Sequence, residues 1–177
     1  MFLPKFLKLT FTGDVMGDAN SRRNPSHRLY TPEQRVRRDA SPWTLVQGIL
    51  APIQFLVFLV SLALVIRYLA TGDGYGAATI SILVKTFFLY LIMVTGSIWE
   101  KVVFDQWLFA HAFFWEDVIS FVVIALHSLY LYGLFWGSFA PETLIVIALA
   151  AYATYVVNAG QFLWKLRSAR LQSEVAA

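Results

Sequence analysis

Four long apolar stretches separated by short connections dominate the pattern of hydrophobic and polar positions. They cover residues 43–69, 77–104, 113–136 and 142–164. Each is long enough to cross the hydrocarbon core of a bilayer as an α-helix, which takes about 20 residues. The connections 71–76 and 137–141 are short, so neighbouring helices should be antiparallel. The pattern predicts an all-α integral membrane protein built as a bundle of four transmembrane helices.

The regions outside the four stretches are polar. We interpret residues 1–30 as a flexible or interfacial N-terminal extension, residues 31–170 as the transmembrane domain and residues 171–177 as a disordered tail.

Two helix-start signals precede the first stretch. Thr31 can cap a short helix that begins at Pro32, with Gln34 completing a capping box. Ser41 and Pro42 repeat the signal directly before the first span.

Basic residues predict the orientation. Eight Lys and Arg residues lie within the N-terminal 42 residues, and Lys165, Arg167 and Arg170 follow the last stretch. The connections 71–76 and 137–141 carry none. Because cytoplasmic loops are enriched in Lys and Arg, both termini are expected in the cytoplasm. The connection between the second and third spans should then face the cytoplasm too.

That connection belongs to a segment, residues 99–117, with an unusual concentration of ionisable and aromatic groups. It holds four of the eleven acidic residues and three of the six tryptophans. With the ends of the other helices it predicts a polar mouth of the bundle, formed by Gln47, Glu100, Glu116, Asp117, Asn158 and Gln161 and ringed by Trp43, Trp99, Trp107 and Trp115. An interfacial aromatic belt is the alternative, and it explains the tryptophans better than the acids.

Polar residues recur at helical spacing within two spans. On the first they are Gln47, Gln54 and Ser61, and on the fourth Thr154, Asn158, Gln161 and Lys165. Steps of seven, four and three residues keep them on one face of each helix. Such faces point inward, either as hydrogen-bonding contacts between helices or as the lining of a pocket.

The third span places an acid and an imidazole on one side. Glu116 and His127 are eleven residues apart, about three turns and roughly 16 Å along the axis. His127 is therefore either a packing residue or a ligand. Lys85, on the second span, is expected to extend to the far membrane surface without a catalytic role.

The composition excludes several kinds of chemistry. The chain has no cysteine, which excludes disulfides and thiolate sites. Nucleotide-binding and metalloprotease motifs are absent from the sequence, and His27, His111 and His127 lack metal-ligand spacing. We expect no cofactor, no metal of its own and no nucleic-acid partner.

Three segments resemble the 3-vinyl bacteriochlorophyllide hydratase family of photosynthetic bacteria. They are residues 30–62, residues 85–104 with the motif WEKVVF and residues 113–127 with the motif FFWED. The family adds water to the 3-vinyl group of a chlorophyll precursor, giving a 3-(1-hydroxyethyl) group. Its pattern often has proline at the position of His111, which argues against a catalytic role for this residue.

The implied reaction needs a proton donor and a base. A partly buried carboxylic acid can protonate the terminal vinyl carbon, and a second carboxylate can accept the proton of the attacking water. Glu100 and Glu116 are the expected pair, with Asp117 in reserve.

The implied substrate is a flat magnesium-containing chlorophyllide or bacteriochlorophyllide with a propionate edge. His127 is expected to ligate its magnesium, Trp99 and Trp115 to stack on the ring, and Lys101, or an arginine within residues 35–38, to hold the propionate. Gln47 and Asn158 complete the expected contacts.

The predicted location is the bacterial inner, or intracytoplasmic, membrane, with the active face cytoplasmic and contacts to the bilayer and to neighbouring enzymes of the pathway. The alternative is a non-catalytic pigment-binding or assembly subunit of a photosynthetic complex. A small transporter is less favoured, because the polar residues gather at one membrane surface.

Overall fold

A computed structural model describes residues 29–174, with side chains to residue 168, and this part of the chain forms five helices. They are α1 (Pro32–Ala40), α2 (Pro42–Thr71), α3 (Tyr75–Phe104), α4 (Phe114–Phe135) and α5 (Pro141–Glu174). By length and composition, α2, α3, α4 and the Pro141–Ser168 part of α5 can each cross a membrane. The predicted all-α class with four membrane helices is confirmed.

The ends of the chain are only partly described. Residues 1–28 of the predicted extension and residues 175–177 lie outside the described residues. Helix α5 ends at Glu174, ten residues beyond the predicted end of the fourth span and inside the segment predicted as a disordered tail.

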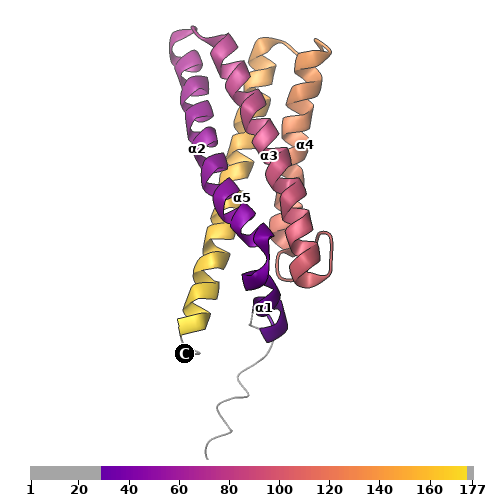
Figure 1. The fold of residues 1–177 in the computed structure, drawn as a ribbon. Coiled ribbons are helices and arrows are strands. Elements are labelled where there is room, and N and C mark those ends of the chain that lie inside the picture. The colour runs from indigo at the N-terminus through magenta and orange to yellow at the C-terminus, as the bar shows by residue number, and fades with distance from the viewer. Residues whose placement is uncertain (1–28, 175–177) are drawn as a thin grey trace, which may run out of the picture.

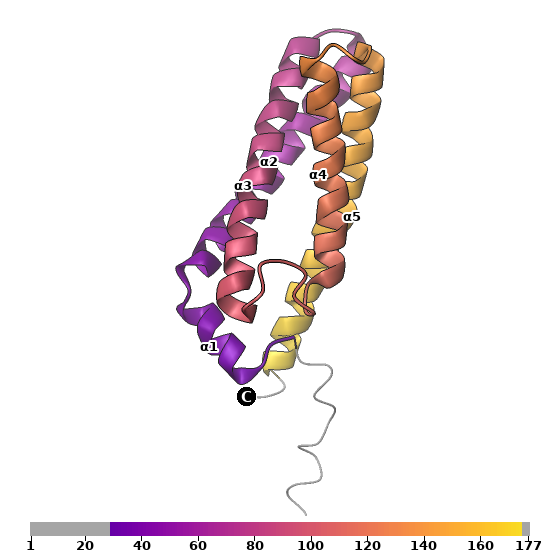
Figure 2. The ribbon, with the colours of Figure 1, turned by 90° about the vertical axis from the view of Figure 1, so that its right-hand side faces the viewer.

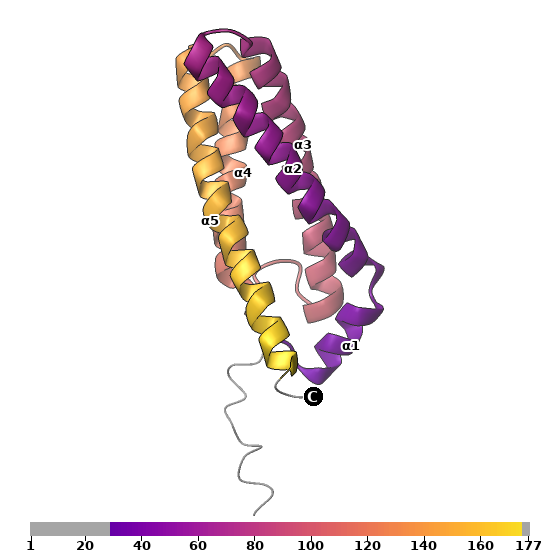
Figure 3. The ribbon, with the colours of Figure 1, turned by 90° about the vertical axis from the view of Figure 1, so that its left-hand side faces the viewer.

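The membrane helices form two antiparallel hairpins, α2–α3 and α4–α5 (Figure 1). The first turns through Gly72 and Gly74, whose φ angles of 75° and 90° suit glycine. Helix α1, the α3–α4 loop of residues 105–113 and the C-terminal part of α5 lie at the opposite end of the bundle, which we call the loop end. The ribbons of the two hairpins diverge toward the loop end, where the loop bridges them (Figures 2 and 3).

The helix starts at the loop end follow the predicted signals. Thr31 Oγ1 accepts from Gln34 N at 3.2 Å, and Thr31 N donates to Gln34 Oε1 at 2.9 Å, which is a capping box. Ser41 Oγ accepts from Trp43 N at 3.3 Å at the start of α2. Proline occupies the first position of both helices, as predicted.

Helix α2 turns polar side chains into the bundle and apolar side chains to its outer surface. On α2, Gln54 and Ser61 are buried, whereas Leu56 and Val60 are exposed, as suits a lipid-facing surface. Ser61 Oγ is 2.7 Å from Ser81 Oγ of α3 and hydrogen-bonds to the hydroxyl of Tyr152 in α5. Ser61 therefore joins three helices by hydrogen bonds.

Gly133 sets the contact between α4 and the start of α5. A Cβ added there would overlap the ring of Phe139 and lie 3.0 Å from Leu144 Cδ2. We expect Gly133→Ala to reduce the free energy of unfolding by about 1–3 kcal/mol, the usual cost of overpacking. The midpoint of thermal denaturation in detergent measures this. Gly48→Ala is the control, since nothing lies within 4 Å of its added Cβ; equal midpoints for the two variants would contradict the packing argument.

Candidate active site

A cluster of aromatic side chains lies at the loop end of the bundle. Tyr30 and Phe113 are buried, and Trp99, Phe104 and Phe162 pack against them. The Trp99 ring lies edge-on to Phe104 and Phe113, with centroids 5.7 and 5.5 Å away. These rings connect the segment before α1, the end of α3, the loop and α5, so they fix where the loop enters α4.

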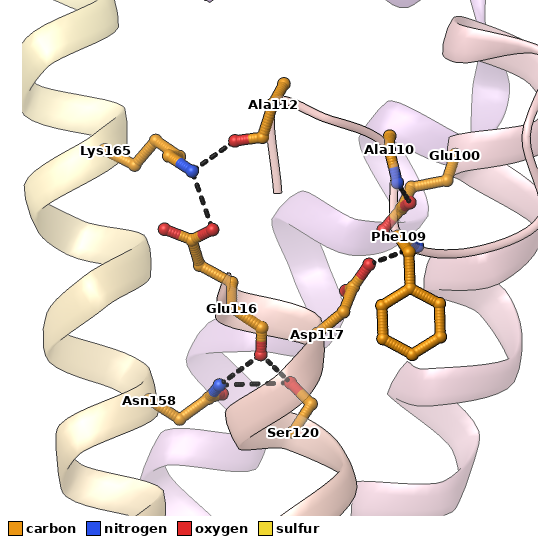
Figure 4. A network of polar contacts seen from close by, with 9 residues as sticks. All are labelled: Glu100, Phe109, Ala110, Ala112, Glu116, Asp117, Ser120, Asn158 and Lys165. Carbon is orange, nitrogen blue, oxygen red and sulfur yellow. Dashed lines mark hydrogen bonds and ion pairs between the residues drawn. The ribbon is translucent and has the colours of Figure 1, made fainter. Parts of the chain in front are cut away.

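Two buried carboxyl groups, on different helices, hold the loop by its main chain (Figure 4). Glu100, near the end of α3, accepts from Ala110 N through Oε2 at 3.2 Å. Asp117, in the first turn of α4, accepts from Phe109 N through Oδ2 at 2.7 Å. Because they accept from the N–H groups of two successive residues, the two carboxyl groups lie near each other. Both side chains are at most 5% exposed, so the pair is shielded from bulk water.

The loop reaches these carboxyl groups through two residues in the left-handed conformation. Asp105 ends α3 with φ 64°, and Phe109 has φ 59°. This conformation costs a non-glycine residue about 1 kcal/mol or more. The exposed Asp105 carboxylate accepts from Lys101 Nζ at 2.7 Å, and this hydrogen bond lowers the pKa of Asp105 below its ordinary value. Hydrogen bonds at both ends thus help to hold the loop.

The third carboxyl group has a cation. Glu116 Oε2 lies 2.6 Å from Lys165 Nζ of α5, and the same ammonium donates to the main-chain oxygen of Ala112 in the loop. Asn158, two turns earlier on α5, donates to Glu116 O at 2.8 Å and to Ser120 Oγ at 3.0 Å. These contacts connect α5 to the start of α4.

The charges of the cluster are unevenly compensated. It contains three buried carboxyl groups and one ammonium, and that ammonium pairs with Glu116. Two neighbouring buried carboxyl groups repel each other when both are ionised, so their proximity favours a single proton held between Glu100 and Asp117. The arrangement can therefore hold one proton for transfer beside one carboxylate that can accept a proton.

The amino-acid sequence of this chain matches one family of known proteins. Residues 30–168 match the family model described as 2-vinyl bacteriochlorophyllide hydratase. A 2-vinyl bacteriochlorophyllide hydratase of Cereibacter sphaeroides is 72% identical over 153 residues, covering 86% of this chain and 94% of the relative. The protein of the same name from Rhodobacter capsulatus is 70% identical over 156 residues, covering 87% of this chain and 90% of the relative.

The chain belongs to the 2-vinyl bacteriochlorophyllide hydratase family. This confirms the resemblance identified in the sequence and the hydro-lyase class, in preference to a non-catalytic pigment-binding subunit. No solved structure matches the chain.

Within this hydratase, the predicted carboxyl residues lie together but pair differently from the expectation. Glu100 lies near Asp117, which the sequence placed in reserve, whereas Glu116 pairs with Lys165. Glu116 and Asp117 are adjacent in the sequence, so their side chains leave α4 about 100° apart. One therefore faces α5 and the other faces α3.

The polar residues expected around the carboxyl groups also contact other helices. Gln47 of α2 donates from Nε2 to Thr95 Oγ1 of α3 at 2.8 Å. A Cβ at Gly96 would lie 3.7 Å from Gln47 Oε1, an ordinary van der Waals distance, so this hydrogen bond does not require glycine at that position. Trp99 Nε1 donates to Thr44 Oγ1 at 3.0 Å, a second connection between the same helices.

Three residues of the segment 99–117 that the sequence singled out are exposed or half-buried. Lys101 forms the ion pair with Asp105 described above, Trp115 is 67% exposed, and the side chain of His111 is exposed. Within the described part of the chain, His111 therefore makes no buried contact that would assign it to the carboxyl cluster, in keeping with the family pattern.

His127 and Lys85 are both buried farther from the loop end. His127 Nδ1 faces Val123 O at 2.8 Å, so it carries the ring proton and leaves Nε2 as an acceptor that has no partner among the described residues. Lys85 is 0% exposed, and its Nζ lies 3.8 Å from the centroid of the Tyr155 ring. The expectation that Lys85 extends to the membrane surface is wrong, because Lys85 shares the inward face of α3 with Ile82 and Leu89.

Lys165 belongs to the site, although the sequence did not indicate this role. Its position on the polar face of the last span, seven residues after Asn158, was visible in the sequence, but its acidic partner was not. The main-chain N–H groups of Phe109 and Ala110 have no sequence signal.

Proposed function

We propose that this hydratase adds water to the vinyl group of a chlorophyllide or bacteriochlorophyllide, giving a 1-hydroxyethyl group, with Glu100 and Asp117 as the acid–base pair. The relatives are named for a 2-vinyl group. We take it to be the 3-vinyl group of the current macrocycle numbering, since the older numbering gives position 2 to the same substituent.

The first step is protonation. The carboxyl group of the pair that carries the shared proton delivers it to the terminal vinyl carbon, which becomes a methyl group. The electron pair of the double bond forms the new C–H bond, and positive charge develops on the inner carbon, where the macrocycle delocalises it. The carboxylate left behind lies close enough to stabilise this charge, as a fixed negative group in a water-poor site does.

The second step is addition of water. A water molecule attacks the inner carbon, and its surplus proton passes to a carboxylate of the pair. The vinyl group and one water thereby become CH(OH)–CH₃, and the pair regains its single proton. Because each carboxyl group can take either role, the geometry does not distinguish the acid from the base.

The observation that carries this proposal is that two buried carboxyl groups, 5% and 4% exposed, bind successive main-chain N–H groups and have no ion-pair partner among the described residues. A buried carboxyl pair is costly to maintain, and perturbed titratable groups of this kind cluster at functional sites. Glu116 also belongs to the site, but its ion pair with Lys165 makes it the least suited of the three to donate a proton.

The contacts of the macrocycle are part of the proposal. The half-buried Trp99 ring can pack against the flat ring, and Gln47 and Asn158 supply polar groups on either hairpin. Trp115 suits a substrate that arrives along the membrane surface. Lys101 can hold the propionate, because its ion pair with Asp105 is exposed and weak; an arginine of α1 is the alternative.

Ligation of the substrate magnesium by His127 stays a prediction. The free Nε2 supports it, whereas the ten residues between Asp117 and His127, about 15 Å along α4, require a pose that reaches deep into the bundle. If the prediction holds, His127→Ala weakens binding of the magnesium pigment at least tenfold, about 1.4 kcal/mol. Absorbance titration with the magnesium-free pigment is the control. Equal losses for the two pigments would show that His127 acts only through packing.

We further propose that the loop end faces the cytoplasm in the bacterial inner, or intracytoplasmic, membrane. Arg35, Arg37, Lys101 and Arg167 all lie at this end, as the positive-inside rule requires. Contacts with neighbouring enzymes of the pathway stay a prediction.

The test of the function is direct. Membranes containing the protein, incubated with 3-vinyl chlorophyllide, should yield a product with the mass of one added water and a blue-shifted absorption band. Membranes from cells without the protein are the control. Stoichiometric pigment binding with no water adduct would support the non-catalytic alternative instead.

A further inference from the structure

Lys165 connects three parts of the hydratase that must stay aligned. It leaves α5 on the same face as Asn158, one heptad earlier. Its Nζ contacts Glu116 Oε2 of α4 at 2.6 Å and Ala112 O of the loop, and lies 5.0 Å from the centroid of the Phe113 ring. The side chain of Glu116 is 7% exposed, and that of Lys165 is 24% exposed. The ion pair is therefore shielded and interacts strongly with neighbouring charges.

The other charged groups near this ion pair are already engaged, so they do not neutralise the charge of Glu116. On α3, Lys101 is engaged by Asp105. On α1, Arg38 pairs with Asp39 and lies over the Tyr30 ring. Helix α2 contributes Gln47 and Thr44, which are neutral, and the loop contributes His111, which is exposed. Among the residues that the structure describes, Lys165 alone forms an ion pair with the carboxyl cluster.

We propose that Lys165 is a positioning residue for hydration: by neutralising Glu116 it leaves Glu100 and Asp117 as the carboxyl groups that share a single transferable proton. This rests on the proposed acid–base role of that pair. Without the ammonium, the Glu116 carboxylate would add a negative charge next to Asp117, and the cluster would retain a further proton. Without Glu116, the ammonium would favour ionisation of both members of the pair, and the transferable proton would be lost at lower pH.

The test is the pH profile of kcat/KM for purified protein in lipid nanodiscs, with 3-vinyl chlorophyllide as substrate. Lys165→Met should move the alkaline limit of activity to higher pH, and Glu116→Gln should move it to lower pH. A shift of about one pH unit or more is expected for each, because the charges lie in a shielded site. The double variant restores the charge balance and should return the limit toward that of the wild type. Lys165→Arg keeps the charge and should resemble the wild type in this limit.

The opposite signs separate this role from a structural one. If Lys165 served only to hold α5 against α4, both single variants would lower kcat/KM with the pH limits unchanged, and the double variant would not restore them. Shifts in the same direction would likewise overturn the proposal. Should Lys165→Met fail to insert or fold, the shift of Glu116→Gln to lower pH remains a sufficient test, and its absence counts against the proposal. Failure of the proposed function is distinct, because the wild type would then form no water adduct.

Discussion

Replacement of Glu100 by Gln is expected to lower the rate of hydration by roughly 10²–10⁴, the usual contribution of a positioned general acid or base. The amide cannot hold the proton that the carboxyl pair shares, and it leaves Asp117 as an isolated carboxylate. Its oxygen can still accept from Ala110 N, so the loop retains its main-chain contact and the variant should fold. Asp117→Asn should cause a loss of similar size, since each member of the pair depends on the other.

The measurement is product formation per mole of inserted protein, after the thermal midpoint has shown that the variant is folded. Glu142→Gln is a matched control, because Glu142 is exposed at the start of α5, at the end of the bundle away from the loop. It should retain the wild-type rate. If Glu100→Gln turns over at a rate within about threefold of the wild type, well short of the usual effect of losing an acid or base, the carboxyl pair is not the acid–base machinery.

The sequence predicted the helices well because their signals are local. The apolar stretches agree with the helix bounds to within about two residues at most ends, where Ser41, Pro42 and Gly72 mark starts and stops. The apolar stretch ends at Trp164, but α5 continues to Glu174, because no proline or glycine interrupts the polar residues that follow. The clustering of the acids followed from topology alone, since antiparallel neighbours bring Glu100 and Asp117 to the same end.

Which residue each carboxyl group of the cluster contacts could not be predicted from the sequence. Adjacent residues such as Glu116 and Asp117 point in directions about 100° apart, so their partners depend on the rotation of α4 about its axis. That rotation is fixed by contacts distant in sequence, including Asn158 with Glu116 O and Tyr90 with Ser128. Periodicity gives the face of a single helix but not the angle at which two helices meet.

Lys85 shows a different limit. Its position ten residues into α3, about 15 Å from the helix start, already leaves it far from the membrane surface. The residues one turn before and after it, Ile82 and Leu89, face inward, so the face could have been recognised from the sequence. The general tendency of lysine to extend to the interface was wrong for this residue, because it ignores rotational position.

Replacement of Lys85 by Met should raise the thermal stability of the hydratase. The amine is fully buried, and Nζ has no hydrogen-bond partner among the described residues. Burial of an unpaired ammonium costs several kcal/mol. The Tyr155 ring offsets part of this cost, about 2 kcal/mol, and only if the amine is charged. Met has a similar length and no polar hydrogen, so it fills the same space without burying an unpaired polar group.

We expect an increase in the free energy of unfolding of about 1–4 kcal/mol, as seen when buried ionic groups are replaced by apolar ones. Thermal denaturation in detergent measures it, and Lys101→Met, at an exposed ion pair, is the control that should change the midpoint little. Hydration should persist in Lys85→Met, because fifteen residues, about 22 Å along α3, separate Lys85 from Glu100. A lower midpoint would contradict the predicted gain in stability, and a folded variant without activity would show that Lys85 contributes to hydration.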